Sequence, residues 1–111
     1  MRLEDGPAHV RGWIEVSESG TSLVLRIGGE LDAASRTSIE PEVMAATTSA
    51  SSVVIDLDAM TFCDSSGIAM FIAAHENAKA RATALVIRRV RPPVRRVFEI
   101  ANLGSLIELI E

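Results

Sequence analysis

The chain has little of several residue types that would point to particular chemistries. Its 111 residues include one cysteine, one tryptophan, three phenylalanines, two histidines and no tyrosine. A single cysteine excludes an internal disulfide and any metal site that needs a second cysteine. His9 and His75 are too few and too far apart in the sequence to suggest a metal site. We therefore expect neither a metal nor any other cofactor.

Long apolar stretches are also missing. No run of about 18 apolar residues occurs, so no membrane span is predicted. The first six residues contain no apolar leader region. These absences favour a cytoplasmic protein with no membrane partner. Hydrophobic residues make up 48% of the chain, which is enough for one domain built on an aliphatic core. We expect a loose lead-in over residues 1–9 and the domain over residues 10–111.

Charge is distributed unevenly along the chain. The net charge is −4, but residues 1–64 hold 11 acids and 4 bases (sum −7), whereas residues 65–111 hold 4 acids and 7 bases (sum +3). Five of the 11 basic residues lie in the nine positions from Arg88 to Arg96. An acidic chain with one basic segment argues against nucleic acid as a direct partner and suits a protein partner. The Arg88–Arg96 segment is either a solvated face or a docking surface for an acidic partner.

Hydrophobic periodicity predicts alternating strands and helices. Strands are expected over 10–16, 23–27, 52–57, 84–87 and 105–110, and helices over 34–48, 66–81 and from Pro93 to a C′ glycine at Gly104. Residues 17–20 have turn chemistry, and Gly28 and Gly29 are expected to break the second strand. The order β-β-α-β-α-β-α-β predicts an α/β fold: a mainly parallel mixed sheet of about five strands, with an N-terminal antiparallel hairpin and helices packed on it.

Some local features leave alternatives open. Trp13 is expected at the edge of the sheet. Asp32 or Ser35 is expected to cap the first helix. Pro41 either kinks that helix or marks the start of its regular part near Glu40. Cys63 is either a small buried hydrophobe or a redox-active thiol.

Polar residues cluster between the strand at 52–57 and the helix that follows. They are Asp64, Ser65, Ser66 and Gly67. Sites in open α/β sheets tend to lie at the carboxyl ends of strands, and a helix N-terminus favours a phosphate. A purely structural interpretation stands beside this one, because Asp and Ser cap helices and glycine permits close packing.

Three segments resemble the STAS family of bacterial anti-sigma factor antagonists, over about residues 10–110. Residues 29–32 (Gly-Glu-Leu-Asp) resemble its motif after the second strand. Residues 54–57 followed by 62–67 (Phe-Cys-Asp-Ser-Ser-Gly) resemble its strand and Asp-Ser-Ser/Thr-Gly loop. Residues 93–98, then Leu103 and Gly104, resemble its third helix.

The resemblance implies a function in sigma factor regulation and stress response. Ser65 stands where the family is phosphorylated by its partner, an anti-sigma factor that is a serine kinase. The unphosphorylated form would bind the kinase and free a sigma factor, and a PP2C-type phosphatase would reset the switch. Ser66 would cap the helix, Gly67 would let the kinase approach, and the protein would be a monomer or weak dimer. The expected partner contacts are Asp32, Asp64, Ser66, Gly67 and Arg95.

Two other classes of function are weighed against this switch. One is a STAS-type scaffold or accessory protein, in a signalling complex or with a transporter, that binds without being phosphorylated. The other is an enzyme, which is disfavoured because a serine nucleophile needs a positioned base. Neither histidine lies near Ser65 in sequence, and the chain has no Gly-x-Ser-x-Gly elbow or phosphate loop.

Overall fold

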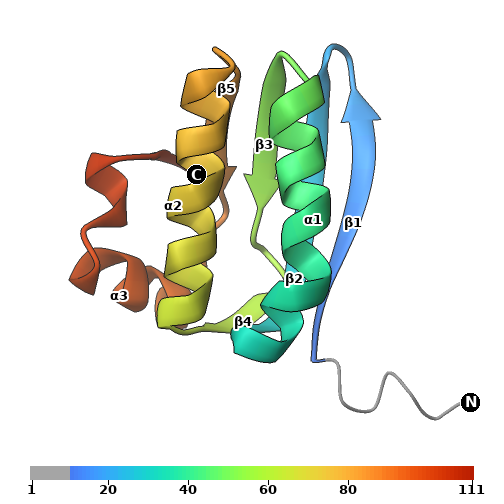
Figure 1. Cartoon of the computed structure of the whole chain (residues 1–111). Helices are drawn as coiled ribbons and strands as arrows, with labels where there is room; N and C mark the ends of the chain where they lie inside the picture. The colour runs from blue at the N-terminus through green and yellow to red at the C-terminus, as the bar shows by residue number, and fades with distance from the viewer. Residues whose placement is uncertain (1–10) are drawn as a thin grey trace, which may run out of the picture.

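Two long helices lie side by side over one face of a twisted, mixed sheet (Figure 1). The computed structural model describes residues 11–111, so the expected lead-in over 1–9 lies outside the described residues. The strands are β1 (Gly12–Ser19), β2 (Ser22–Leu31), β3 (Ser52–Asp56), β4 (Met60–Cys63), β5 (Ala84–Arg88) and β6 (Glu108–Ile110). The helices are α1 (Ala33–Ser49), α2 (Ser65–Ala80) and α3 (Pro92–Ile100), with a short 3₁₀ turn at Leu103–Ser105.

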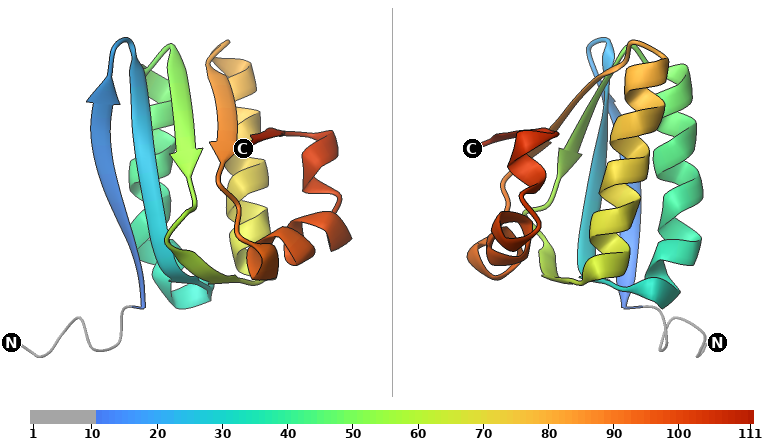
Figure 2. Two further views of the ribbon diagram at one scale, coloured as in Figure 1. Left: turned by 180° about the vertical axis from the view of Figure 1, so that it is seen from behind. Right: turned by 60° about the vertical axis from the view of Figure 1, so that its left-hand side comes forward.

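The sheet runs in the order β1-β2-β3-β5-β6, and β4 also pairs with β2. The β1–β2 hairpin is antiparallel and every other pair is parallel. Seen from behind, the strands lie in front of α1 and α2 (Figure 2). The predicted α/β fold with an N-terminal antiparallel hairpin is therefore confirmed, with six strands in place of about five.

The extra strand is β4, which the sequence interpretation took as part of the polar loop. It has only four residues, and two of them are exposed, so it gives almost no periodic signal. It exists because β2 is long: β3 pairs with residues 22–26 of β2, and β4 pairs with residues 29–31. The polar cluster therefore follows β4 and not the strand at 52–57.

The paired glycines do not end β2, contrary to expectation. Gly29 adopts a positive φ of +75°, and the β2–β4 register shifts between Gly29 and Glu30. That bulge needs the conformation that glycine takes most easily. A side chain at Gly28 would collide with the ring of Trp13. Trp13 lies on the edge strand β1, which confirms its predicted place.

The boundaries of two helices correct the predictions. Helix α1 begins at Ala33 and runs through Pro41 to Ser49, so its regular part does not begin near Glu40. Helix α3 ends at Ile100, and Asn102, with φ +57°, takes the left-handed conformation that was expected of Gly104. Asparagine is the commonest non-glycine residue in that conformation.

The core lies between the sheet and α1 and α2. Alternate residues of the central strands, such as Leu25, Ile27 and Ile55, are fully buried there, as the period of a strand requires. Phe71 of α2 and Phe98 of α3 meet edge to face, with ring centroids 5.5 Å apart. This contact joins α3 to the rest of the core.

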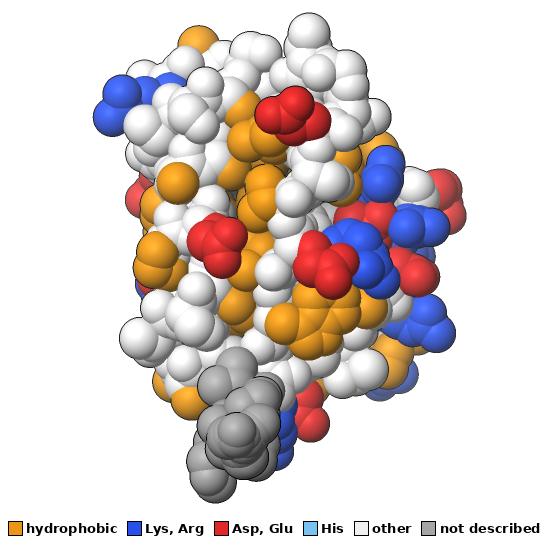
Figure 3. All heavy atoms as spheres, turned by 90° about the vertical axis from the view of Figure 1, so that its right-hand side faces the viewer, with side chains coloured by type: hydrophobic (Ala, Val, Ile, Leu, Met, Phe, Trp, Pro, Cys, Tyr) orange, Lys and Arg blue, Asp and Glu red, His pale blue; other side chains and the backbone are white. Residues whose placement is uncertain are grey.

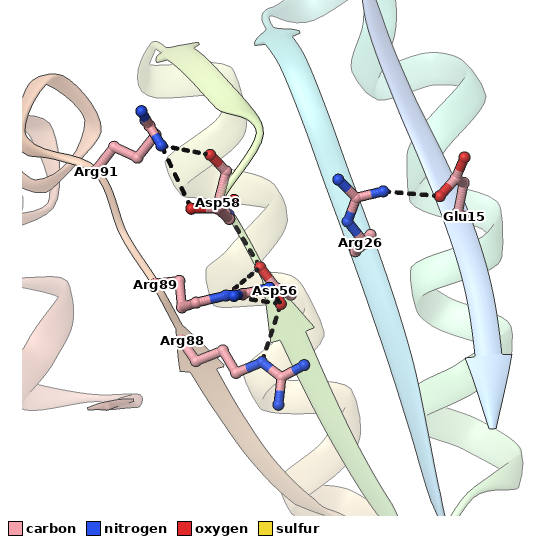
Figure 4. Close-up of polar contacts among 7 residues, drawn as sticks. All are labelled: Glu15, Arg26, Asp56, Asp58, Arg88, Arg89 and Arg91. Atoms are coloured by element: carbon pink, nitrogen blue, oxygen red, sulfur yellow. Dashed lines mark hydrogen bonds and ion pairs between the residues drawn. The ribbon is translucent and has the colours of Figure 1, made fainter. Parts of the chain in front are cut away.

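The opposite face of the sheet carries a row of charges. Glu15, Arg26, Asp56 and Arg88 are in register across β1, β2, β3 and β5. Asp56 is buried, and its carboxylate accepts hydrogen bonds from Arg88 (3.0 Å) and Arg89 (2.7 Å), as Figure 4 shows.

Much of the Arg88–Arg96 segment is therefore already paired. Arg91 adds an ion pair to Asp58 at 3.3 Å. Three of the five arginines in the segment thus form ion pairs with Asp56 and Asp58, near the ends of β3 and β5. The sequence had suggested a solvated face or a docking surface, and neither interpretation included these ion pairs.

Candidate functional site

Two helix N-termini meet where β2 and β4 end. Leu31 and Cys63 are register partners in these neighbouring parallel strands, and the Asp64 N–H donates to the Leu31 carbonyl at 3.2 Å. The next residue of each chain segment, Asp32 and Asp64, is the N-cap of α1 and α2 respectively. The sheet thus brings the two predicted aspartates to one rim of the molecule, at the lower end of the view in Figure 1.

Asp32 and Ser35 cap α1 together. Asp32 Oδ1 accepts from the Ser35 N–H at 2.9 Å, and Ser35 Oγ accepts from the Asp32 N–H at 3.0 Å. The sequence left the choice between them open, and the structure uses both as a capping box. The hydrogen bond from the Ser35 N–H, together with Arg11, lowers the pKa of the Asp32 carboxyl. Asp32 is therefore a fixed anion at neutral pH.

Asp64 caps α2. Its Oδ1 accepts from the N–H groups of Ser66 (2.8 Å) and Gly67 (3.3 Å). The expectation that Ser66 caps the helix is wrong: Ser66 supplies a backbone donor, and Asp64 supplies the acceptor. Because the Asp64 carboxylate already occupies this helix N-terminus, an added phosphate would have to compete with it for the same donors.

Ser65 is the first residue of α2 and its side chain is exposed. Within residues 11–111 its hydroxyl makes no hydrogen bond, whereas the carboxylate of Asp64 before it accepts two. The cap geometry explains this, since Asp64 turns its carboxylate toward the helix axis to reach two backbone N–H groups. The Ser65 hydroxyl is left at the rim, open to an approaching macromolecule.

Gly67 and Cys63 are buried and closely packed beneath the first turn of α2. A Cβ on Gly67 would lie 2.5 Å from Cys63 Sγ and 2.8 Å from Leu31 Cδ2, so this glycine permits close packing between α2 and the strands. Gly67 is buried, which supports the packing role over contact with a partner. Burial, with a smaller effect of Asp64, raises the pKa of the Cys63 thiol to about 12. A protonated, 2% exposed thiol behaves as a small hydrophobe and does not fit a redox role.

Arg36 links the two helix starts, and sequence reasoning missed it. Its Nη1 donates to the Ser66 carbonyl at 3.3 Å, while its Nε donates to Glu40 at 2.8 Å. Only the second contact had a local signal, the i,i+4 spacing of opposite charges on a helix. Arg11 was missed too; it pairs with Glu30 and Asp32.

Arg95 lies apart from the two caps. It is exposed on α3, and its guanidinium donates to the Val90 carbonyl at 3.0 Å. It lines a hollow of about 380 Å³ with residues of α3 and the C-terminal strand, among them Phe98 and Leu109. Within residues 11–111 no hydrogen bond or ion pair connects it to Asp32 or Asp64.

The rim presents an acidic, binding-type surface. Among residues 11–111, no group of three or more His, Cys, Asp or Glu side chains is arranged to hold a metal ion. No helix in the same range has the length and hydrophobicity to cross a membrane. The arrangement offers the exposed hydroxyl of Ser65 beside the two capping carboxylates, which suits recognition by a protein.

Comparison with known proteins identifies the domain family of the chain. The family described as "Mlab, STAS domain" matches residues 14–110. The anti-sigma-B factor antagonist of Listeria monocytogenes is 28% identical over 98 residues, which cover 86% of this chain and 86% of that protein.

Solved structures show the same fold. An anti-sigma factor antagonist from Mycobacterium paratuberculosis has a TM-score of 0.82 at 24% identity, covering 89% of this chain and 85% of that one. SpoIIAA in its unphosphorylated form has a TM-score of 0.75 at 22% identity, with 87% of each chain covered. The phosphorylated form of Bacillus SpoIIAA has a TM-score of 0.68 at 21% identity, covering 87% of this chain and 90% of that one.

Proposed function

Because the chain belongs to the STAS domain family, we propose that it is an anti-sigma factor antagonist whose binding is switched by phosphorylation of Ser65. In this proposal the unphosphorylated form binds an anti-sigma factor that is also a serine kinase, and a sigma factor is released. The relative in Listeria, named an anti-sigma-B factor antagonist, supports the class of partner. The protein acts as a binding module in the cytoplasm and catalyses nothing itself.

The exposed hydroxyl of Ser65 is the observation that carries the proposal. It is the first residue of α2, directly after the capping Asp64, and its side chain points out at the rim. A kinase needs an accessible hydroxyl on a chain segment that it can approach. Ser66 is half-buried and its backbone is held on both sides, by Asp64 and by Arg36. Ser65 is therefore the better acceptor of the two serines.

Phosphate on Ser65 would disrupt an interface through charge and desolvation. It adds about −1.5 to −2 charges at neutral pH. The phosphate would stand beside the carboxylate of Asp64, and Asp32 caps the neighbouring helix. A partner that covers this rim would have to strip water from the phosphate and from Asp64 together, whereas Asp32 is already paired with Arg11. Burying unpaired charge is costly. A PP2C-type phosphatase would remove the phosphate and restore binding by a monomer or weak dimer.

Three measurements on candidate anti-sigma kinases test the switch. The affinity of each kinase is measured for the wild type, Ser65→Asp and Ser65→Ala, and phosphate is mapped by mass spectrometry after incubation with kinase and ATP. We expect phosphate on Ser65 and binding of Ser65→Asp weakened at least tenfold, or about 1.4 kcal/mol. Ser65→Ala is expected to bind and to stay unphosphorylated.

A matched control separates the switch from a general effect of charge. Ala80→Asp adds the same charge at an exposed residue at the last position of α2, the opposite end of the helix from Ser65, and is expected to bind as the wild type does. If no phosphate appears and all four proteins bind alike, the switch is refuted. The loop would then be only a helix cap, as in a scaffold protein.

A further inference from the structure

The outer edge of β1 is long, and its protection consists of acidic side chains. The strand has eight residues, Gly12–Ser19, in an unbroken antiparallel register with β2. At about 3.4 Å per residue, the edge is about 27 Å long. Proteins protect such edges with charged side chains, especially lysine, with proline or with bulges. Within β1 there is neither proline nor lysine, the pairing with β2 shows no bulge, and the charged side chains are Glu15 and Glu18.

A groove with apolar and polar parts runs between this edge and α1. Val16 of β1 is 44% exposed. It lines a hollow of about 230 Å³ with Leu23, Ala45 and Ala46. A second hollow of about 530 Å³, lined mainly by polar residues, reaches from Glu18 to the end of α1 and shares Leu23 and Ser49 with the first. The two hollows form one depression, called here the β1–α1 groove.

Acidic side chains border the β1–α1 groove. Glu42 of α1 lines the first hollow and Glu18 of β1 lines the second. Neither forms an ion pair with another of residues 11–111. Figure 3 shows this face, where hydrophobic side chains form a band with acidic side chains beside it.

The charges select one kind of occupant. A second copy of the chain pairing through β1 would place two β1 strands side by side. The charged side chains of β1 are all acidic, Glu15 and Glu18, and like charges on paired strands are destabilising. An added strand with lysine or arginine would instead meet Glu18 and Glu42. Glu18 lies on the same face of β1 as Val16, and Glu42 lines the hollow on that face, so the basic and the apolar side chains must both stand on the groove-facing positions of the added strand.

We propose that the β1 edge and the β1–α1 groove bind an extended segment of a partner protein, with apolar and basic residues on its groove-facing positions, as an added β-strand. Backbone hydrogen bonds to β1 would supply affinity, and the groove and its acids would supply specificity. This surface lies along the edge strand and is distinct from the Ser65 rim, so both can be occupied together.

Designed peptides take the place of the partner segment in the test. The probe is a capped ten-residue peptide with threonine at every second position and valine and lysine alternating at the positions between. One control has glutamate in place of lysine, and another is N-methylated at alternate residues so that one backbone edge cannot form hydrogen bonds. Binding is followed by amide chemical shifts in NMR and by the fluorescence of Trp13, the sole tryptophan, which lies on β1.

We expect the valine–lysine peptide to shift the amides of β1 and of α1 near Glu42, and both control peptides to fail. Replacing both acids (Glu18→Lys with Glu42→Lys) is expected to weaken binding roughly tenfold or more. The matched double variant, Glu76→Lys with Glu99→Lys, makes the same change of net charge at exposed acids of α2 and α3 and is expected to change binding less than about twofold. The wild-type peptide comparison stands even if a variant folds poorly.

Three results would overturn the proposal. Equal binding of the N-methylated peptide would show that no strand is added. Equal weakening by Glu76→Lys with Glu99→Lys would show that net charge alone causes the effect. Shifts of β1 amides on raising the protein concentration alone would show that a second copy occupies the edge.

Discussion

Asp64 serves both as the cap of α2 and as a negative charge beside Ser65, and two variants separate these roles. Asp64→Ala removes the acceptor for the Ser66 and Gly67 N–H groups. It is expected to lower the free energy of unfolding by about 1–2 kcal/mol in urea denaturation. Asp64→Asn retains a capping oxygen and is expected to cost much less.

The same two variants also test whether the charge of Asp64 contributes to stability. If Asp64→Asn is as destabilising as Asp64→Ala, the carboxylate acts through the helix dipole and not through its hydrogen bonds. If both variants fold as the wild type does, Asp64 is not the cap that the geometry indicates.

At the residue scale, local chemistry was predictable and long-range contacts were not. Asp32, Ser35 and Asp64 were recognised as capping candidates because capping depends on residues three or fewer positions away. Arg36 was missed because its contact with the Ser66 carbonyl spans 30 positions. The burial of Gly67 against Leu31 depends equally on the β2–β4 register, which no local pattern reveals.

Among the elements, α1 is notable for containing a proline. Pro41 lies in the ninth position of a 17-residue helix, where it removes one backbone donor and crowds the preceding turn. Because Pro41 is exposed, Pro41→Ala removes no core packing. We expect it to raise the free energy of unfolding by about 1–3 kcal/mol, measured by urea denaturation.

A second exposed position in α1 provides the comparison. Ser38→Ala, one turn earlier, is expected to change stability by less than about 0.5 kcal/mol. A destabilised Pro41→Ala variant would mean that the proline limits the unfolded chain more than it strains the helix.

The buried Asp56 couples β3 to β5 and makes stability depend on pH. Burial alone would raise the pKa of this carboxyl, but hydrogen bonds from Arg89, the Asp58 N–H and Arg88 outweigh it, so the pKa lies below its usual value of 3.8. A lowered pKa contributes stability that is fully present above the unfolded value. That stability is lost as the pH falls through the folded value.

Asp56→Asn is therefore expected to lower the free energy of unfolding at pH 7 and to change it little in strong acid. We expect a loss of about 2–3 kcal/mol at pH 7, below the 3–5 typical of a broken buried pair, because Arg88 and Arg89 both reach water. Asp58→Asn is the control: its pair with Arg91 is half exposed on both sides and is worth at most about 1 kcal/mol. A difference from wild type that stays constant between pH 7 and pH 3 would contradict this account.

Which elements the sequence predicted depended on their length and periodicity. Helices α1 and α2 and strand β3 were found to within two residues, because each is long or strongly apolar. Strand β4 has only four residues, and β2 continues through Gly28 and Gly29 because a bulge and the ring of Trp13 need glycine there. These features follow from pairing between distant segments, and a window along the chain does not contain that information.

For the whole molecule, one continuous core is the feature that governs folding. Buried residues from β2, β3, α1, α2 and α3 form a single cluster, and Ile14 of β1 packs against it. The hairpin is in register over its full length, so β1 has no independent packing that would let it unfold alone. We expect a single cooperative transition in urea, with a slope of about 1–3 kcal/mol per molar.

Trp13 makes this expectation testable with two probes. Its fluorescence reports on the edge strand β1, where the ring packs over Gly28 and lies 5.2 Å from the Arg26 guanidinium. Far-UV circular dichroism reports mainly on the helices, which lie at the other side of the core. The two transitions are expected to have the same midpoint. A fluorescence midpoint at lower urea would show that β1 separates first, and the core would then hold the hairpin less firmly than its register implies.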